Sequence, residues 1–318
     1  MTSVTLRPTV AHHYADLGDV RLHYVEAGRG PLVVLLHGFP EFWYSWRFQI
    51  PILAEAGFRV VAPDMRGYNL SDKPPGVGDY RAEVLGRDVE RLIRACGAES
   101  ATLVGHDWGG VAAWLAAMHY PERVERLAIL NCPHPDHFLR DLWTPRQLRK
   151  SWYMFALQVP GKLVQESIFA WIKSNFRRDP VRPGTFTEED IQRYAEAMAR
   201  PGALTATTNS YRALSRRTPA QARKLLRRVE APVLVIWGEK DRYLGVELAE
   251  PERSWVPDVR VERLLDASHW VQQDSPHKVN ALLLEFLRAP GRRDGTGDAD
   301  LSPNDLDPGA GRGGPSAE

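Results

Sequence analysis

The chain has 318 residues, of which 43% are hydrophobic and 25% are charged, a composition typical of a globular enzyme with a large core. The formal net charge is +1, so no global field attracts nucleic acid or an anionic membrane. No stretch reaches the run of about 18 apolar residues that a membrane span needs, and the N-terminus has no signal-peptide pattern. We therefore expect a cytoplasmic protein that binds neither nucleic acid nor a membrane.

Short apolar runs alternate with amphipathic helical segments. The polarity of residues 22–25 alternates, which predicts an antiparallel strand at a sheet edge. A continuous apolar run, which is typical of a parallel strand buried on both faces, lies at 31–36. Further segments predicted to be strands lie at 58–62, 101–105, 124–130, 232–237 and 259–265. Helical periodicity or helix-forming composition predicts helices at 50–56, 82–95, 110–118 and 276–288.

The alternation stops between about residues 133 and 223, where one helical segment follows another. A βα series with such an insertion predicts a parallel-sheet core with a helical cap above the carboxyl ends of its strands. We expect a core of residues 1–133 and 223–290, a cap of 134–222 and a disordered tail of 291–318. The large aromatic residues of the insertion are expected to form mostly the core of the cap, with some facing a pocket: Trp143, Trp152, Phe155, Phe169 and Trp171.

Asp107 stands between the predicted strand 101–105 and the predicted helix 110–118, with a glycine two positions to either side. This pattern predicts a nucleophile elbow, a tight turn that exposes one side chain. The glycines leave room for the facing helix and strand. A carboxylate that attacks carbon forms an alkyl ester, so Asp107 predicts displacement at sp³ carbon rather than acyl transfer. His106 is expected to point away from the nucleophile and to support packing.

Such an ester needs a base that activates the hydrolytic water. His269 lies between the last predicted strand and the last helix, where the base of a nucleophile–acid–base order is expected. Asp241 follows the strand 232–237 and is the predicted acid that orients this imidazole. Asn131 occupies the alternative place for the acid, after the preceding strand. It carries no charge, which favours Asp241.

Two backbone N–H groups are predicted to form an oxyanion hole, that of Trp108 after the nucleophile and that of Phe39 in the loop after the strand 31–36. The Phe39–Pro40 bond is a candidate cis peptide. Asp64 ends a strand on the same side of the sheet, and we expect it to brace its loop through Arg66.

Other candidate groups carry weaker signals. His134 and His137 share a helical spacing, but no carboxylate or cysteine set completes a metal site, and the pair His12–His13 is similar. Cys96 and Cys132 are too few for a disulfide framework and are predicted to be small buried side chains. Neither a metal nor an organic cofactor is expected.

Five segments together resemble the epoxide hydrolases of the α/β-hydrolase superfamily. They are 37–41 (HGFPE), 43–47 (WYSWR), 64–68 (DMRGY), 105–110 (GHDWGG) and 268–270 (SHW), and the resemblance extends from about Val20 to Leu287. It implies an α/β-hydrolase fold, with a mostly parallel eight-stranded sheet and an inserted helical cap.

The resemblance also implies two cap tyrosines that bind the epoxide oxygen and protonate the leaving alkoxide. Tyr153, within residues 151–161, and Tyr211, within 209–212, match these motifs. The chemistry agrees, since a phenol with a pKa near 10 carries its proton at neutral pH. The expected reaction opens a small apolar epoxide with water to a vicinal diol, in a monomer or a homodimer.

Other functions are also compatible with parts of this pattern. Dehalogenases share the Asp, His and Asp set, but haloalkane dehalogenases typically have Asn in place of Phe39, and fluoroacetate dehalogenases have Arg in place of Trp108. Both differences favour epoxides. A non-catalytic binding protein of this fold commonly lacks one member of the set. An esterase is disfavoured because attack by Asp in place of Ser would give a mixed anhydride.

Overall fold

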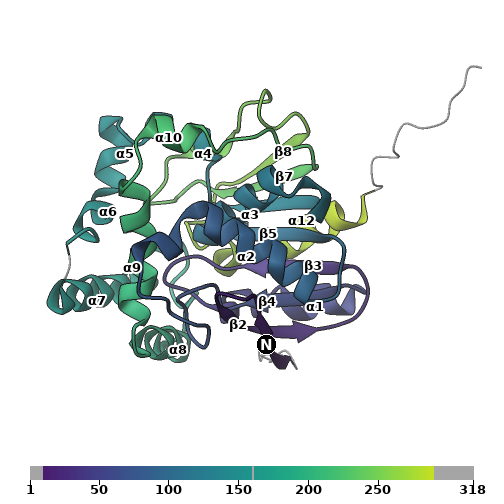
Figure 1. The fold of residues 1–318 in the computed structure, drawn as a ribbon, viewed down its shortest axis with the longest axis horizontal. Helices are drawn as coiled ribbons and strands as arrows, with labels where there is room; N and C mark the ends of the chain where they lie inside the picture. The colour runs from purple at the N-terminus through teal and green to yellow at the C-terminus, as the bar shows by residue number, and fades with distance from the viewer. Residues whose placement is uncertain (1–9, 160, 290–318) are drawn as a thin grey trace, which may run out of the picture. The chain divides into compact units, whose positions relative to one another are not determined.

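The structure is a computed structural model that describes residues 10–159 and 161–289. In this part of the chain the strands form one eight-stranded sheet in the order β1-β2-β4-β3-β5-β6-β7-β8, with helices packed against it (Figure 1). Strands β3 to β8 run parallel to one another, and β1 and β2 pair antiparallel. The strand bounds are β1 (Ala11–Asp16), β2 (Arg21–Ala27), β3 (Leu32–Leu36), β4 (Arg59–Pro63), β5 (Ala101–His106), β6 (Val124–Leu130), β7 (Val233–Gly238) and β8 (Val259–Leu264). The expected fold class is confirmed.

The central strands divide their apolar side chains between two core layers, one on each face of the sheet. In β3, Val34 belongs to one layer, whereas Val33 and Leu35 belong to the other, because successive residues of a strand point to opposite faces. Helices α2 (Ala82–Ala95) and α3 (Trp108–His119) supply residues to the first layer. Helices α1 (Ile50–Glu55), α11 (Val271–Asp274) and α12 (Pro276–Arg288) supply the second. Burial on both faces explains the continuous apolar runs of the sequence.

The edge strand is not where the sequence predicts it. Residues 22–25 lie within β2, which pairs with β1 on one side and with β4 on the other, so the expectation of an edge strand at 22–25 is wrong. The edge is β1, in which every side chain except that of Ala15 is exposed. A strand with so few buried residues gives almost no apolar pattern in the sequence.

Between β6 and β7 the described residues form helices and no strand, as predicted. These helices are α4 (Pro135–Asp141), α5 (Pro145–Lys150), α6 (Trp152–Ala156), α7 (Lys162–Arg178), α8 (Glu188–Ala199), α9 (Ala203–Ser215) and α10 (Pro219–Arg223). They lie beside the sheet at its carboxyl-terminal edge in Figure 1, and contacts join the chain up to Leu287 into one compact unit. The predicted disordered tail, 291–318, lies outside the described residues.

The aromatic residues of these inserted helices differ from the expectation. Trp143, Trp152 and Phe155 are 58%, 52% and 47% exposed, so their assignment to the core of the cap is wrong. Phe169 and Trp171 are partly buried and pack against the first core layer. Trp152 and Phe155 of α6 and Trp143 before α5 point outward, a direction that composition alone does not reveal.

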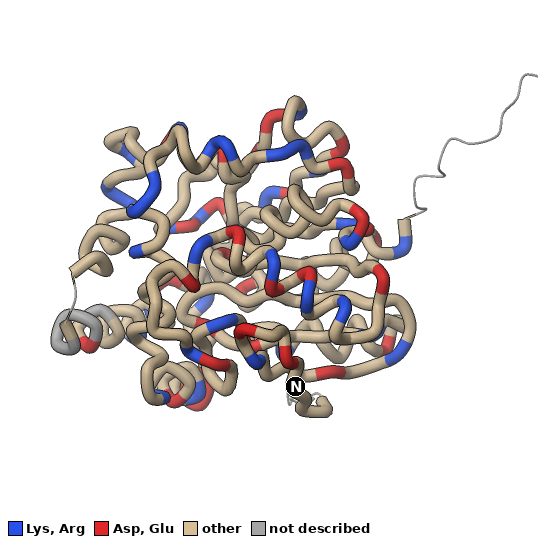
Figure 2. Tube along the Cα trace, in the orientation of Figure 1, with Lys and Arg blue, Asp and Glu red and all other residues tan. Residues whose placement is uncertain are grey.

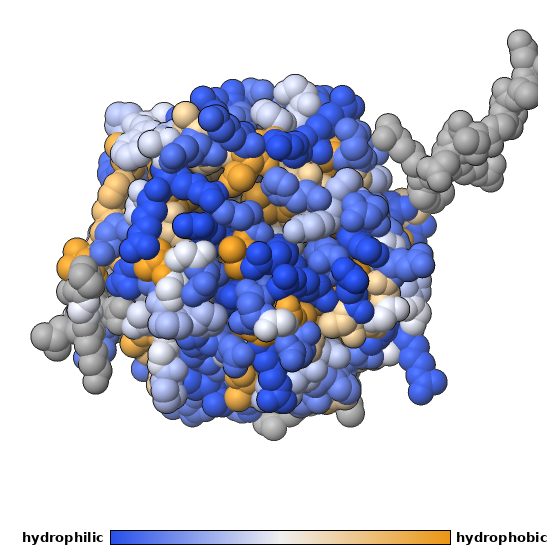
Figure 3. Space-filling view, viewed as in Figure 1, coloured by the Kyte–Doolittle hydropathy of each residue, from blue (hydrophilic) through white to orange (hydrophobic). Residues whose placement is uncertain are grey.

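Charges of both signs are intermixed along the chain, and Figure 2 shows no extended region of one sign. On the face in Figure 3, hydrophilic residues predominate and hydrophobic residues form small separate patches. Among the described residues, no helix has the length and apolar character to cross a membrane. Cys96 and Cys132 are buried free thiols, as expected.

Candidate active site

Asp107 lies in a sharp turn between β5 and α3. Its backbone has φ 50° and ψ −121°, a conformation that a residue with a side chain rarely adopts. The turn is possible because its neighbours lack side chains: a Cβ on Gly105 would lie 2.6 Å from the carbonyl oxygen of Gly109, and one on Gly109 would lie 2.1 Å from that of Leu36. The helix and the two strands therefore meet at these glycines and lift the Asp107 carboxylate above the sheet, as the elbow pattern predicts.

The Asp107 carboxylate faces a backbone donor and an imidazole. Oδ1 accepts a hydrogen bond from the Phe39 N–H at 2.8 Å, and Oδ2 lies 3.7 Å from His269 Nε2. The Trp108 N–H belongs to the first turn of α3, where N–H groups have no partner within the helix. The Phe39–Pro40 peptide bond is cis. Within the described residues, Oδ1 has a backbone donor, whereas Oδ2 faces the imidazole.

His269 lies in the loop between β8 and α11 and is buried. Its Nδ1 is 2.7 Å from Asp241 Oδ2, which leaves Nε2 directed at the nucleophile. Burial alone would lower the pKa of this imidazole, but the adjacent Asp241 carboxylate, followed by that of Asp107, raises it to about 9. The imidazole is therefore protonated at neutral pH.

Asp241 follows β7 and is held by four donors. Oδ1 accepts from the backbone N–H groups of Tyr243 and Leu244, at 2.7 and 2.9 Å. Oδ2 accepts from His269 and from the Asn131 amide, the latter at 2.8 Å. Burial by itself would raise the pKa of Asp241, but His269 and these hydrogen bonds hold it below its usual value.

Asn131 occupies the position that the sequence suggests as an alternative place for the acid. Its amide donates a hydrogen bond to Asp241, the candidate acid. Its Oδ1 also accepts from the Gly238 N–H at 2.8 Å, so one amide ties the ends of β6 and β7 together. The two candidate positions for the acid are next to each other because their strands are neighbours in the sheet.

Tyr153 of α6 and Tyr211 of α9 face Asp107 from the inserted helices. Their rings are 5.9 Å apart, and the ring of Tyr211 packs edge-on against Phe39 at 5.3 Å and Trp108 at 5.1 Å. Burial, followed for Tyr153 by the charge of Asp107, raises the pKa of both phenols above the usual value of 10. Both hydroxyls therefore hold their protons at neutral pH.

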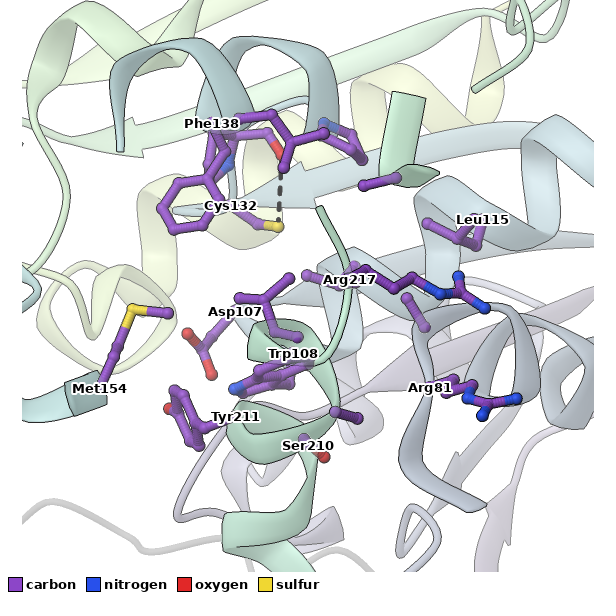
Figure 4. A pocket seen from close by; sticks show the side chains of 18 of the residues that line it. Arg81, Asp107, Trp108, Leu115, Cys132, Phe138, Met154, Ser210, Tyr211 and Arg217 are labelled. Atoms are coloured by element: carbon purple, nitrogen blue, oxygen red, sulfur yellow. Dashed lines mark hydrogen bonds between the residues drawn. The ribbon is translucent and has the colours of Figure 1, made fainter. Parts of the chain in front are cut away.

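A pocket opens over the nucleophile, with a volume of about 150 Å³ (Figure 4). Asp107, Trp108 and Tyr211 lie at one end in Figure 4, and Arg81 and Arg217 lie toward the opposite side. The rest of the lining is largely apolar, with residues from α3, from the inserted helices and from the turn after α10 that include Leu115, Phe138, Leu139, Met154, Leu214 and Leu225. An apolar wall beside a few polar groups fits a small apolar substrate.

His106 has partners that sequence reasoning missed. Its Nε2 is 2.9 Å from the backbone carbonyl oxygen of His269, and its Nδ1 is 2.9 Å from Glu41 Oε2. Glu41 is buried, and it also accepts a hydrogen bond from Ser45. Both nitrogens of His106 face acceptors, so this residue anchors the main chain of the candidate base instead of only filling space. No local sequence pattern joins residues so far apart in the chain.

The expected contact between Asp64 and Arg66 is wrong. Asp64 accepts from His23 Nδ1 at 2.6 Å and from Asn69 Nδ2 at 2.9 Å. Arg66 instead forms a buried pair with Asp88 of α2, with two hydrogen bonds of 2.7 Å. The guanidinium turns away from its sequence neighbour because a bidentate partner is available on the helix.

Three histidines with weaker sequence signals, His12, His134 and His137, have structural contacts. His12 Nδ1 is 2.9 Å from His23 Nε2, at the edge of the sheet. His134 accepts from the Asp136 N–H at the start of α4, and His137 contacts the Glu250 carbonyl oxygen. Within residues 10–159 and 161–289, no group of three metal-ligating side chains is found.

Comparison with known proteins agrees with this geometry. Residues 31–276 match the α/β-hydrolase fold family. The chain is 41% identical over 282 residues to the AB hydrolase superfamily protein YfhM of Bacillus subtilis (strain 168), covering 86% of this chain and 97% of that protein. It is 39% identical over 295 residues to Epoxide hydrolase 4 of Homo sapiens, covering 89% and 80% of the two chains. The crystal structure of Epoxide Hydrolase A from Mycobacterium thermoresistibile has a TM-score of 0.76 at 34% identity, covering 88% and 99%.

The chain therefore belongs to the α/β-hydrolase fold family. Within that family, its resemblance to the epoxide hydrolases is confirmed by relatives and solved structures of that name.

Proposed function

We propose that this protein is an epoxide hydrolase that opens small apolar epoxides to vicinal diols through a covalent ester on Asp107. The observation that carries the proposal is a carboxylate in the nucleophile position, with a backbone donor on one oxygen and an imidazole 3.7 Å from the other. Two protonated phenols face it across an apolar pocket. The inserted segment, 134–222, acts in this proposal as the cap over a core of 1–133 and 223–290.

In the first step, Asp107 Oδ2 attacks an epoxide carbon and the carbon–oxygen bond of the ring breaks. Tyr153 and Tyr211 bind the departing oxygen, and one of them gives it a proton. An alkoxide is a poor leaving group, so this transfer removes the main cost of ring opening. The product of the step is a hydroxyalkyl ester of Asp107 and a phenolate.

Ester formation then changes the state of the base. The ester carries no charge, so one of the carboxylates that raise the pKa of His269, that of Asp107, is lost. The imidazolium gives up its proton, and the phenolate recovers one by way of solvent. His269 becomes a neutral imidazole only after the nucleophile has reacted.

In the second step, water attacks the ester carbonyl carbon while His269 Nε2 takes a proton from it. The carbonyl oxygen is Oδ1, and the negative charge that develops on it is stabilised by the Phe39 N–H and by the neighbouring Trp108 N–H. Asp241 stabilises the imidazolium that forms. Collapse of the intermediate breaks the ester bond, and the carboxyl proton passes to the released oxygen. The diol leaves, and Asp107 and His269 regain their charges.

Turnover of a panel of terminal and internal epoxides tests this proposal, with diol quantified by chromatography. A bromoalkane of matched size serves as the comparison substrate. We expect diol from at least the small aryl epoxides, such as styrene oxide, and no bromide release. Bromide release without diol formation would identify a dehalogenase instead.

A further inference from the structure

Tyr243 connects the candidate base to the inserted helices. It lies two residues after Asp241, and its ring packs edge-on against two groups of the site, the imidazole of His269 at 5.1 Å and the phenol of Tyr153 at 5.5 Å. The interplanar angles are 71° and 80°. One ring therefore separates the candidate base from a candidate proton donor.

Tyr243 is held both at its main chain and at its hydroxyl. Its backbone N–H donates to Asp241 Oδ1 at 2.7 Å, so the main chain is tied to the acid of the site. Its hydroxyl donates to the buried carboxylate of Asp179, at the C-terminal end of α7, and accepts from Asn175 Nδ2 at 2.9 Å. Burial, followed by the charge of Asp179, raises the pKa of Tyr243, so the phenol remains a donor.

In the part of the chain that the structure describes, the ring of His269 makes one side-chain hydrogen bond, from Nδ1 to Asp241. Rotation about that bond is opposed by ring contacts, which come from His106 at 4.8 Å, Trp270 at 5.1 Å and Tyr243. Trp270 also packs on α7, against Phe176 at 4.9 Å. Tyr243 differs from it because its contact with the helix is made by hydrogen bonds, through Asp179 and Asn175.

We propose that Tyr243 is a positioning residue, which holds the His269 imidazole in its hydrolytic orientation because its hydroxyl is anchored to α7. This inference rests on the two-step reaction proposed above. If Tyr243 has this role, the position of α7 against the core controls the rate of ester hydrolysis. The alkylation step depends on Asp107 and the phenols, and it does not need the imidazole as a base.

The test uses Tyr243→Phe, which keeps the ring and removes the hydroxyl. Ester formation and ester hydrolysis are measured separately, by rapid mixing of excess enzyme with styrene oxide and mass analysis of the quenched protein. We expect hydrolysis to slow by at least about fivefold and alkylation to change by less than about twofold, so that the ester accumulates. Asn175→Leu, which removes the other partner of the hydroxyl, is expected to slow hydrolysis in the same direction.

Arg242→Gln is the matched control. Arg242 precedes Tyr243 in the chain, and its exposed side chain also binds Asp179, at 3.0 Å, but the described partners of the Tyr243 hydroxyl are Asp179 and Asn175, not Arg242. We expect wild-type rates of alkylation and hydrolysis from Arg242→Gln. This result would distinguish loss of the hydrogen bonds of the Tyr243 hydroxyl from a general weakening of the contacts of α7. Thermal unfolding of each variant shows whether it is folded.

A wild-type hydrolysis rate in folded Tyr243→Phe would overturn the inference, and so would an equal slowing of both steps. Either result leaves the proposed function intact, because the ester still forms. Failure of the unmodified enzyme to open any epoxide would instead refute the proposed function.

Discussion

Replacement of Asp107 by Asn is expected to lower the pKa of His269. The change removes a negative charge 3.7 Å from Nε2 and leaves the size of the side chain and the oxygen facing the Phe39 N–H unchanged. Loss of an opposite charge at this distance lowers the pKa of a cation by about 1–3 units, or about 1.4–4 kcal/mol of differential interaction. We therefore expect the pKa of His269 to fall from about 9 by at least about one unit.

The assay is an NMR titration of the imidazole resonances in uniformly ¹⁵N-labelled protein, with His269→Gln for assignment. Asp258→Asn, which neutralises an exposed carboxylate just before β8, is the control and is expected to leave the pKa of His269 unchanged. In Asp107→Asn the side chain at residue 107 is uncharged, as it is in the ester. A pKa that stays within about 0.3 units of the wild-type value would therefore refute the argument that alkylation of Asp107 converts His269 into a base.

Three further outcomes follow from the structure. Tyr153→Phe is expected to slow alkylation by about 10²-fold in single-turnover experiments, because each phenol is a candidate acid. The double variant Tyr153→Phe/Tyr211→Phe is expected to be slower still. Unchanged alkylation in the double variant would exclude that role. Gly109→Ala is expected to destabilise the fold by about 1–3 kcal/mol in urea unfolding, since its Cβ would lie 2.1 Å from the Leu36 carbonyl oxygen; wild-type stability would show that the elbow has room. The raised pKa of His269 contributes stability that is complete below about pH 6.5 and is lost as the pH rises through about 9. Between pH 6 and pH 10, His269→Gln is therefore expected to lose less stability than the wild type. An equal loss in both proteins would contradict this.

Much of the fold could be predicted from the sequence because its strongest signals are local. The strands β3, β5 and β7 are buried along their whole length, and this produces continuous apolar runs. The elbow at Asp107 is equally local, since its glycines are required by contacts within a few residues of the turn and with the adjacent strand. Strand β1 gives no comparable signal because most of its side chains are exposed.

The positions of Asp107, Asp241 and His269 follow from strand order, because the loops after parallel strands meet at one edge of the sheet. Their contacts in the structure agree with that order. The groups behind them could not be predicted in the same way. His106 reaches the His269 main chain over 163 positions of the sequence, and Tyr243 reaches Asp179 over 64, with no repeating pattern between them.

The expected pair of Asp64 and Arg66 is a contact that the sequence predicts and that the structure does not have. Proximity in sequence favoured that pair, but the long Arg66 side chain reaches a helix, where Asp88 receives it with two hydrogen bonds. Both carboxylate oxygens of Asp64 accept from other donors, Oδ1 from the Trp43 N–H and Oδ2 from His23 and Asn69. Side-chain pairing of this kind is decided by tertiary packing.

The ester at Asp107 is the central intermediate of the proposed reaction, and intact-mass analysis of His269→Gln after brief exposure to styrene oxide tests it most directly. Removal of the base is expected to leave alkylation in place and to stop hydrolysis. The protein should therefore gain the mass of one epoxide molecule, and peptide sequencing should locate the added mass on Asp107. Continued diol formation by this variant with no adduct, or an adduct at another residue, would contradict the account.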